Sequence, residues 1–332
     1  MENNIYDITI VGAGPVGLFT ATYALMRQAK VQIIESLSEI GGQVSALFPS
    51  KQIYDIPGFA KISGAELIEN LKTQLDFFDP EIHLNETVIN FNKNNDHFEI
   101  TTNKRTTYSK TIILATGVGA FEPRKLKIQN AAEFENKFLF YNVPDILMFK
   151  DKDVVIAGGG DSAADWTFEL SQVAHHVTLI HRRDQFRALE SSISKIKALD
   201  NTQILTPFMV EALTQKNDQL NITLKRSRTK DDFKTLTADA LIVNYGFMTD
   251  TSVMQKWNLK INHRQIEVAH NQQTSIAGVY AVGDTAFQEG NVDLIATGFG
   301  QAPIAVNHAM NTIYPEKRQA THSTQLMKNF NL

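Results

Sequence analysis

The chain has 332 residues, a length at which two domains with separate cores are expected. Hydrophobic residues make up 43% and charged residues 20% of the chain, which excludes disorder, collagen and coiled coil as descriptions of the whole. A formal net charge of -4 gives no general attraction to nucleic acid or to anionic membranes, so we expect neither as a partner. The absence of cysteine excludes disulfides, thiolate zinc sites, cysteine nucleophiles and an internal dithiol relay.

The N-terminal residues enter an apolar run without a basic region or a small-residue cleavage site. No apolar stretch is long enough for a membrane span. We therefore expect a soluble, cytoplasmic protein.

A strand, a glycine turn and a helix are predicted at the start of the chain. Residues 5–11 are apolar and β-branched, and the sequence GAGPVG follows them at 12–17. In such a turn Gly12 permits the tight bend, Gly14 lets the backbone approach a pyrophosphate, and Gly17 lets helix and strand pack closely. The pyrophosphate then lies at the N-terminus of the helix.

An acidic residue completes this first pattern. The next apolar run, 30–34, is predicted to be a strand and ends in Glu35, whose carboxylate can accept hydrogen bonds from both hydroxyls of a ribose. Strand, glycine turn, helix and acid in this order indicate a dinucleotide-binding domain more specifically than the glycines alone.

The same pattern recurs in the middle of the chain. The strand-like residues 154–157 run into GGGDSA at 158–163, where Ala163 replaces the third glycine, and a further strand is predicted over 176–180. This internal repeat predicts a second dinucleotide site.

Basic residues replace the acid in the second copy. His181 follows its strand as Glu35 follows the first, and Arg182, Arg183 and Arg187 come soon after. Guanidinium groups bind a 2′-phosphate in bidentate fashion and a carboxylate would repel it, so this site should prefer NADP(H). The alternative is that the basic residues form a solvated strand end.

Two dinucleotide sites in one chain suggest a tightly bound flavin dinucleotide and a diffusible nicotinamide coenzyme. Residues 111–114 read as a strand that runs into the turn Ala115-Thr116-Gly117. Another predicted strand, 278–282, leads to Asp284, which could bind the ribityl hydroxyls of FAD. Taken alone, Asp284 is equally consistent with an ordinary turn residue.

With these motifs in place, the chain resembles the two-dinucleotide flavoproteins of the thioredoxin-reductase type over essentially its whole length. The matching motifs are GAGPVG, GGQ at 41–43, DIPG at 55–58, ATG at 115–117, GGGDSA, HRRDQFR at 181–187 and GVYAVGD at 278–284. Thioredoxin reductases carry a CxxC motif before the second glycine strand, near residues 140–149 here, where this chain has no cysteine. Within the group it therefore looks like the thioredoxin-reductase-like (type 2) ferredoxin–NADP reductases, which LIATGFGQAP at 294–303 and the tail around 321–324 also resemble.

The resemblance implies an α/β fold of two Rossmann-like, three-layer ββα domains. An NADP-binding domain, 121–249, is expected to be inserted into an FAD-binding domain made of 1–120 and 250–332. A helix beginning near 298–303 is expected to direct its N-terminal dipole toward the flavin. The polar segment 215–235 is expected to form a solvated hairpin.

The resemblance also implies the residues that contact each cofactor. FAD contacts are implied for Gly12, Gly14, Pro15, Gly17, Glu35, Gly42, Gln43, Phe48, Val88, Thr116, Gly117, Phe121, Asp284 and Thr324. NADP(H) contacts are implied for Gly158, Gly160, Asp161, Ser162, Ala163, His181, Arg182, Arg183 and Arg187. Tyr54 and His322 are implied to stack on opposite faces of the flavin ring. Taken singly, Phe48, Val88 and Phe121 are more typical of a core than of a binding site.

The implied activity is that of a ferredoxin–NADP(+) reductase, with ferredoxin or flavodoxin as partner and a homodimer as the assembly. Hydride transfer between NADPH and flavin N5, followed by release of single electrons, needs no protein acid or base, so no obligatory catalytic side chain is expected. The nine histidines show no metal-binding spacing, and no metal site is expected. Two alternatives remain open at this point: an NADPH dehydrogenase that reduces a small quinone or free flavin, and a flavin-holding NADPH sensor without turnover.

Overall fold

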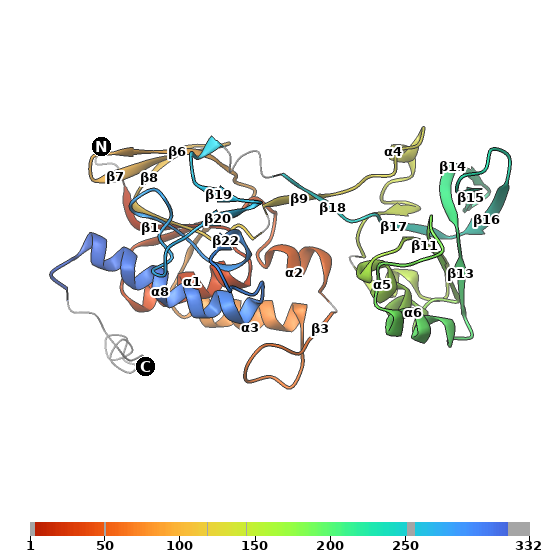
Figure 1. The fold of residues 1–332 in the computed structure, drawn as a ribbon, viewed down its shortest axis with the longest axis horizontal. Helices are drawn as coiled ribbons and strands as arrows, with labels where there is room; N and C mark the ends of the chain where they lie inside the picture. The colour runs from red at the N-terminus through yellow and green to blue at the C-terminus, as the bar shows by residue number, and fades with distance from the viewer. Residues whose placement is uncertain (1–3, 50, 118, 144, 251–255, 318–332) are drawn as a thin grey trace. The chain divides into compact units, whose positions relative to one another are not determined.

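The computed structural model describes residues 4–49, 51–117, 119–143, 145–250 and 256–317. The chain forms two compact units (Figure 1). Unit 1 comprises Met1–Ala120 and Thr249–Leu332, and unit 2 comprises Phe121–Met248. Two short strands, β9 (Ala120–Pro123) and β18 (Phe247–Asp250), pair with each other where the chain enters and leaves unit 2.

Unit 1 is built on a seven-stranded sheet that begins with the predicted N-terminal strand. Its parallel part has the order β5 (Glu81–His83), β2 (Val31–Ile34), β1 (Ile5–Val11), β8 (Thr106–Leu114) and β21 (Val279–Ala281). The first half of β8 also pairs antiparallel with β7 (His97–Thr102), which pairs with β6 (Val88–Asn94). The long strand β8 therefore belongs to both the parallel sheet and the antiparallel extension.

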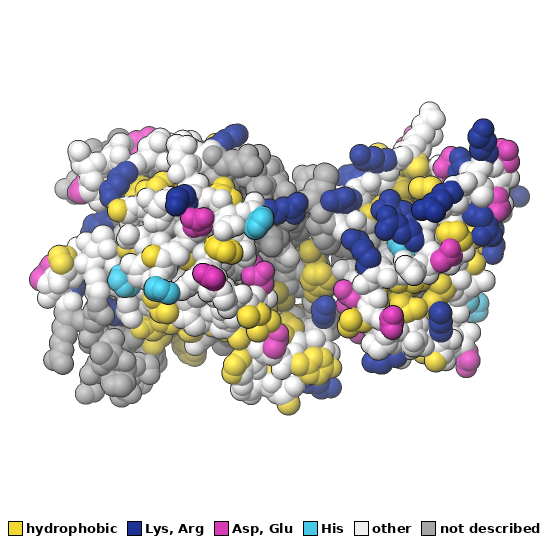
Figure 2. Space-filling view, in the orientation of Figure 1, with side chains coloured by type: hydrophobic (Ala, Val, Ile, Leu, Met, Phe, Trp, Pro, Cys, Tyr) yellow, Lys and Arg dark blue, Asp and Glu magenta, His cyan; other side chains and the backbone are white. Residues whose placement is uncertain are grey.

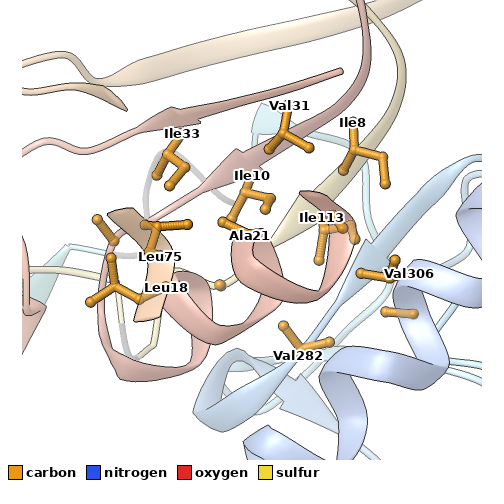
Figure 3. Close-up of a cluster of buried hydrophobic side chains, with 14 of the residues drawn as sticks. Ile8, Ile10, Leu18, Ala21, Val31, Ile33, Leu75, Ile113, Val282 and Val306 are labelled. Carbon is orange, nitrogen blue, oxygen red and sulfur yellow. The ribbon is translucent and has the colours of Figure 1, made fainter. Parts of the chain in front are cut away.

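Helices cover one face of the parallel sheet in unit 1. They are α1 (Pro15–Met26), α3 (Gly64–Asp76) and α8 (Ile295–Ile313), and a capping box between Ser63 and Glu66 starts α3. Apolar side chains from the strands and from these helices interlock between the two layers (Figure 3), among them Ile8, Ile10, Leu18, Leu75 and Val306. Continuous apolar runs are typical of parallel strands, which are buried on both faces.

Several smaller elements complete unit 1. They are α2 (Gly42–Leu47), the strand pair β3 (Gln52–Ile53) and β4 (Ile62–Ser63), the short helix η2 (Gly283–Thr285), and a sheet of β19 (Ile261–Asn262), β20 (Gln265–Glu267) and β22 (Ala286–Phe287). Trp257 packs in a second hydrophobic core of this unit and donates its indole N–H to the carbonyl of Ile89 at 3.1 Å.

Unit 2 repeats the parallel arrangement with a different third layer. Its sheet has the order β10 (Leu139–Phe140), β17 (Ala240–Asn244), β11 (Asp153–Gly158), β12 (His176–Ile180) and β13 (Thr202–Leu205). The helices α5 (Asp161–Ser171) and α6 (Glu190–Lys197) and the 3₁₀ helix η1 (Ile146–Phe149) pack against one core, and the short helix α4 (Ala131–Phe134) against another. An antiparallel sheet of β14 (Phe208–Lys216), β15 (Gln219–Arg226) and β16 (Phe233–Ala238) packs against that second core. The predicted α/β fold with two three-layer units is thus confirmed.

Two details of the predicted elements are wrong. Segment 215–235 is more than a solvated hairpin, because β15 is the middle strand of three and buries Leu220, Ile222 and Leu224 in the core. Its alternation of apolar and polar residues is that of a sheet with one buried face. The helix expected near 298–303 begins earlier, at Ile295, and Pro303 lies inside it. Loss of one backbone hydrogen bond at Pro303 is tolerated in a helix whose inner face is buried.

Candidate dinucleotide-binding sites

The first glycine loop joins β1 to α1 and is open at one position only. A Cβ on Gly12, which has φ +104°, would lie 2.5 Å from the carbonyl oxygen of Ala115. A Cβ on Gly17 would lie 2.0 Å from the carbonyl oxygen of Gly12. By contrast, a Cβ on Gly14, the N-cap of α1, would meet nothing within 4 Å. Two of the three glycines are therefore required by the protein's own packing, and Gly14 leaves free space at the helix N-terminus.

Glu35 ties the end of β2 to this loop. Its carboxylate is 5% exposed and accepts hydrogen bonds from the backbone N–H of Ala13 at 2.6 Å and of Leu37 at 2.8 Å. The hydroxyl of Ser36 donates a third at 3.1 Å. Because a carboxylate has about four acceptor positions, capacity remains for a ribose hydroxyl. Glu35 thus supports the loop in addition to the role that the sequence predicts for it.

Further predicted residues lie around the first loop in unit 1. Pro15 opens α1, and Gly42 begins α2, where its Cβ would lie 3.1 Å from the Cα of Gly14. Gln43 is half-buried in α2 and Phe48 follows it. The side chain of Val88 is instead part of a hydrophobic core, as its residue type suggests. Tyr54 is 70% exposed, which leaves its ring accessible for stacking.

The turn after β8 contacts the turn after β21. The hydroxyl of Thr116 lies 3.0 Å from that of Thr285, and Gly117 adopts φ +57° in open space. Burial, and the nearby charge of Asp293, raise the pKa of the Asp284 carboxyl. Gln265 joins these two acids, since its amide donates to the backbone carbonyl of Asp284 and to the carboxylate of Asp293. The side chain of Phe121, and the whole of His322 and Thr324, lie outside the part of the chain that the structure describes.

The second glycine loop joins β11 to α5 with a different turn. Gly158 has no positive φ, but a Cβ there would lie 2.6 Å from both the Ala163 Cβ and the Asn244 carbonyl oxygen. Ala163 therefore takes the place of the third glycine because this turn leaves room for its methyl group. Gly160, the N-cap of α5, faces open space, with one guanidinium nitrogen of Arg187 at 4.0 Å. Ser162 follows it in the first turn of the helix.

A basic cluster surrounds this loop. The ring of His181 lies against Gly159, where a Cβ would be 2.1 Å from the imidazole. The centroid of the His181 ring is 5.0 Å from that of the Phe186 ring. Burial, and then the charges of Arg182, Arg183 and Arg187, lower the pKa of His181. The three arginines are exposed at the end of β12 and beyond, and Lys and Arg side chains gather on the face of unit 2 that Figure 2 shows. This loop is thus basic where the first one is acidic.

Comparison with known proteins agrees with this pair of loops. Residues 6–309 match the profile of the pyridine nucleotide-disulphide oxidoreductases. The chain belongs to this family. It is 50% identical to a ferredoxin–NADP reductase of Ligilactobacillus salivarius, with 99% of this chain and 97% of that protein covered. It is 46% identical to ferredoxin–NADP reductase 2 of Latilactobacillus sakei, over 98% of this chain and 99% of that protein.

Two solved structures share the fold. Thioredoxin reductase from T. acidophilum superimposes with a TM-score of 0.74 and 26% identity, covering 95% of this chain and 99% of that one. The enzyme from Lactococcus lactis gives 0.75 at 24% identity, covering 93% and 99%. The resemblance inferred from the motifs is therefore confirmed.

Among the described residues, no helix is long and apolar enough to cross a membrane, and no three His, Asp or Glu residues are grouped to hold a metal ion.

Sequence reasoning missed one buried polar residue near the first glycine loop, Gln301. This α8 side chain is 5% exposed, and its Oε1 accepts the Gly283 N–H at 2.7 Å, directly before Asp284. Its Nε2 is buried without a protein partner among the described residues. A glutamine on the inner face of a helix gives no local signal of such a contact, because its partner lies in another part of the chain.

Replacing Gln301 with leucine should destabilise the protein by about 1–3 kcal/mol, because the buried Gly283 N–H loses its acceptor. Denaturant unfolding measures this loss, and amide hydrogen exchange at Gly283 should accelerate with it. Val306→Ala, in the same helix, is the control: it should cost stability through packing alone and leave the exchange of Gly283 unchanged relative to its neighbours. Equal protection of Gly283 in both variants would contradict the assigned contact.

The lowered pKa of His181 predicts acid sensitivity in unit 2. The folded state binds this proton less well than the unfolded state, so stability should fall as the pH drops from the ordinary pKa of 6.5 toward the lower folded value. Thermal unfolding of His181→Phe, which keeps a ring against Gly159, should depend less on pH in this window. His175 is the control, because its hydrogen bond to Asp153 raises its pKa: its stabilising effect is fully present below the ordinary pKa of 6.5, so its replacement should change the pH dependence only above that value. If the pH dependence of thermal unfolding were the same in His181→Phe as in the parent protein, His181 would not be the source of the acid sensitivity.

Proposed function

We propose that this protein is an FAD-dependent ferredoxin–NADP(+) reductase that transfers electrons between NADPH and ferredoxin or flavodoxin. The observation that carries the proposal is the contrast between two copies of one loop, one tied to a buried carboxylate and one followed by a cluster of three arginines. The names of the relatives supply the identity of the protein acceptor. The absence of cysteine adds that electrons leave to an external acceptor rather than through a dithiol.

Unit 1 is proposed to hold FAD. The free space at Gly14, beside the N-terminus of α1, fits a pyrophosphate, since nothing in the protein lies within 4 Å of a Cβ there. Glu35 would then accept from the adenosine ribose and Asp284 would meet the ribityl hydroxyls. The Asp284 carboxyl, whose pKa is raised by burial, can accept hydrogen bonds from these hydroxyls. The remaining contacts are proposed for Pro15, Gln43, Phe48, the main chain of Val88, Thr116, Phe121 and Thr324, with Tyr54 and His322 stacking on the ring.

Unit 2 is proposed to hold NADPH. Gly160 gives the pyrophosphate access to the N-terminus of α5, and Arg182, Arg183 and Arg187 supply charge-assisted hydrogen bonds to the 2′-phosphate. His181, with its lowered pKa, is neutral near pH 7 and adds a ring to the floor of the loop. When bound, the flavin supplies hydride acceptance and single-electron release. The protein's task is then to position the flavin and the coenzyme, tune the flavin's reactivity and exclude competing reactions.

Stopped-flow reoxidation by a panel of acceptors tests this function. The FAD-loaded protein is first reduced with NADPH and then mixed with ferredoxin, flavodoxin, a small quinone or free flavin. We expect rapid reduction by NADPH and the fastest reoxidation by ferredoxin or flavodoxin. Faster reoxidation by quinone or free flavin would instead indicate an NADPH dehydrogenase, and reduction without multiple turnovers would indicate a sensor.

We also propose a cytoplasmic homodimer, for which light scattering gives the mass in solution.

A further inference from the structure

A short segment after the basic cluster lies along the second glycine loop. The backbone N–H groups of Arg187 and Ala188 both donate to the carbonyl of Gly159, at 2.7 and 3.3 Å. The next N–H, that of Leu189, donates to Oδ1 of Asp161 at 3.1 Å. Three consecutive donors therefore fix the segment 187–189 on the loop that joins β11 to α5.

The third hydrogen bond is the one that depends on a side chain. Any residue at 159 supplies a carbonyl, whereas the contact to Leu189 needs an acceptor at position 161. Packing holds this end of the segment only weakly, because the Leu189 side chain is 68% exposed. Asp161 is the first residue of α5 and Leu189 is the N-cap of α6, so the carboxylate links the starts of two helices.

This link bears directly on Arg187. Its guanidinium lies 4.0 Å from the Cβ position of Gly160, on the open side of the loop. A guanidinium binds phosphate tightly only when its planar fork is held in register with the oxygens. Fixing the backbone at Arg187 and at the two residues after it reduces the entropy that this side chain loses on binding.

Asp161 differs from the arginines of the cluster because its charge is negative. Its effect on a bound phosphate is therefore not purely attractive. A carboxylate near the N-terminus of α5 stabilises the helix but repels the phosphates of a dinucleotide. Loss of its charge alone should therefore strengthen anion binding, while loss of its hydrogen bond should weaken it. The two effects have opposite signs and can be separated by substitution.

We propose that Asp161 is a positioning residue that sets selectivity for the 2′-phosphate by holding segment 187–189 on the glycine loop. The proposal rests on the proposed function of unit 2 as an NADPH site. It changes the role predicted for Asp161 from direct contact with the coenzyme to support of Arg187 through the Leu189 N–H.

Calorimetric titration of the full-length, FAD-loaded protein with 2′,5′-ADP and with 5′-ADP tests the proposal without any turnover. In Asp161→Ala the affinity for 2′,5′-ADP should fall about 10-fold below that of Asp161→Asn, because both variants lose the charge and only alanine also loses the hydrogen bond that supports Arg187. Affinity for 5′-ADP should change less than about 3-fold. Asp161→Asn keeps the acceptor and removes the charge, so it should bind 2′,5′-ADP as tightly as the parent or more tightly.

Glu190→Ala is the matched control, since it removes an acidic residue from the first turn of α6 that holds no part of the segment. It should bind 2′,5′-ADP as the parent does or more tightly. Tighter binding of 2′,5′-ADP by both Asp161 variants, to the same extent, would mean that Asp161 acts only as a repulsive charge. Equal weakening for 2′,5′-ADP and 5′-ADP would mean that Asp161 supports the loop but does not set selectivity. If the alanine variant does not fold, Asp161→Glu, which displaces the acceptor by one methylene, replaces it with the same expected loss. The titrations contain no electron acceptor, so they test the role of Asp161 even if the ferredoxin assay fails.

Discussion

The variant Gly14→Ala is expected to fold like the parent protein and to bind FAD on the order of 100-fold more weakly. A methyl group at this position meets no protein atom within 4 Å, so folding is not hindered. It occupies the space at the N-cap of α1 that we assign to the pyrophosphate, and the loss of its backbone contacts corresponds to about 2.7 kcal/mol. Flavin absorbance after dialysis and a fluorescence titration with FAD measure the change.

Gly17→Ala is the matched comparison, because its methyl group would lie 2.0 Å from the carbonyl oxygen of Gly12. Here the backbone must move, and we expect a loss of about 3 kcal/mol in the free energy of unfolding, the upper range for overpacking. The two alanine variants should therefore separate: one loses the ligand and the other loses stability. Tight FAD binding by Gly14→Ala would refute the assignment of the pyrophosphate site.

The second large effect is expected for coenzyme choice in unit 2. Arg182→Ala and Arg187→Ala should each weaken NADPH binding by about 10- to 150-fold, since a charge-assisted contact is worth about 1.5 to 3 kcal/mol. NADH, which has no 2′-phosphate, should be affected little. Coenzyme titrations and the ratio of kcat/KM for NADPH and NADH measure the selectivity.

Arg226→Ala gives the control for this prediction, because that arginine at the end of β15 pairs with Asp232, lies outside the segment 181–187 and should leave both coenzymes unchanged. Equal weakening of NADPH and NADH by Arg182→Ala and Arg187→Ala would mean that these residues bind the part common to both coenzymes. The role in 2′-phosphate recognition would then be wrong.

Much of the fold was predictable because its central strands are buried on both faces. Such strands leave continuous apolar runs, and the runs at 5–11 and 176–180 coincide with β1 and β12. The glycine positions were predictable because the turn allows no side chain at Gly12 or Gly17. The start of α8 at Ile295 was less predictable than its existence, because its N-cap, Leu294, makes no side-chain capping hydrogen bond that would mark the boundary.

The contacts that hold the two sites together were less accessible to sequence reasoning. The hydrogen bond from the Gly283 N–H to Gln301 and the one from the Leu189 N–H to Asp161 join segments that no local pattern relates. The role of Glu35 in holding Ala13 was likewise hidden behind its predicted role toward a ribose. Such supporting contacts depend on tertiary structure, whereas the binding motifs depend on local backbone geometry.

The insertion of unit 2 sets the order in which the chain can fold as it is synthesised. Strand β21 adds to β8 in the sheet of unit 1, yet it emerges from the ribosome only after all of unit 2 has been made. Unit 2 draws every strand of its parallel sheet from 139–244, so it can close while the first half of unit 1 still waits for β21 and α8. Because domains generally fold as units during synthesis, the middle of this chain should become protease-resistant before its beginning does.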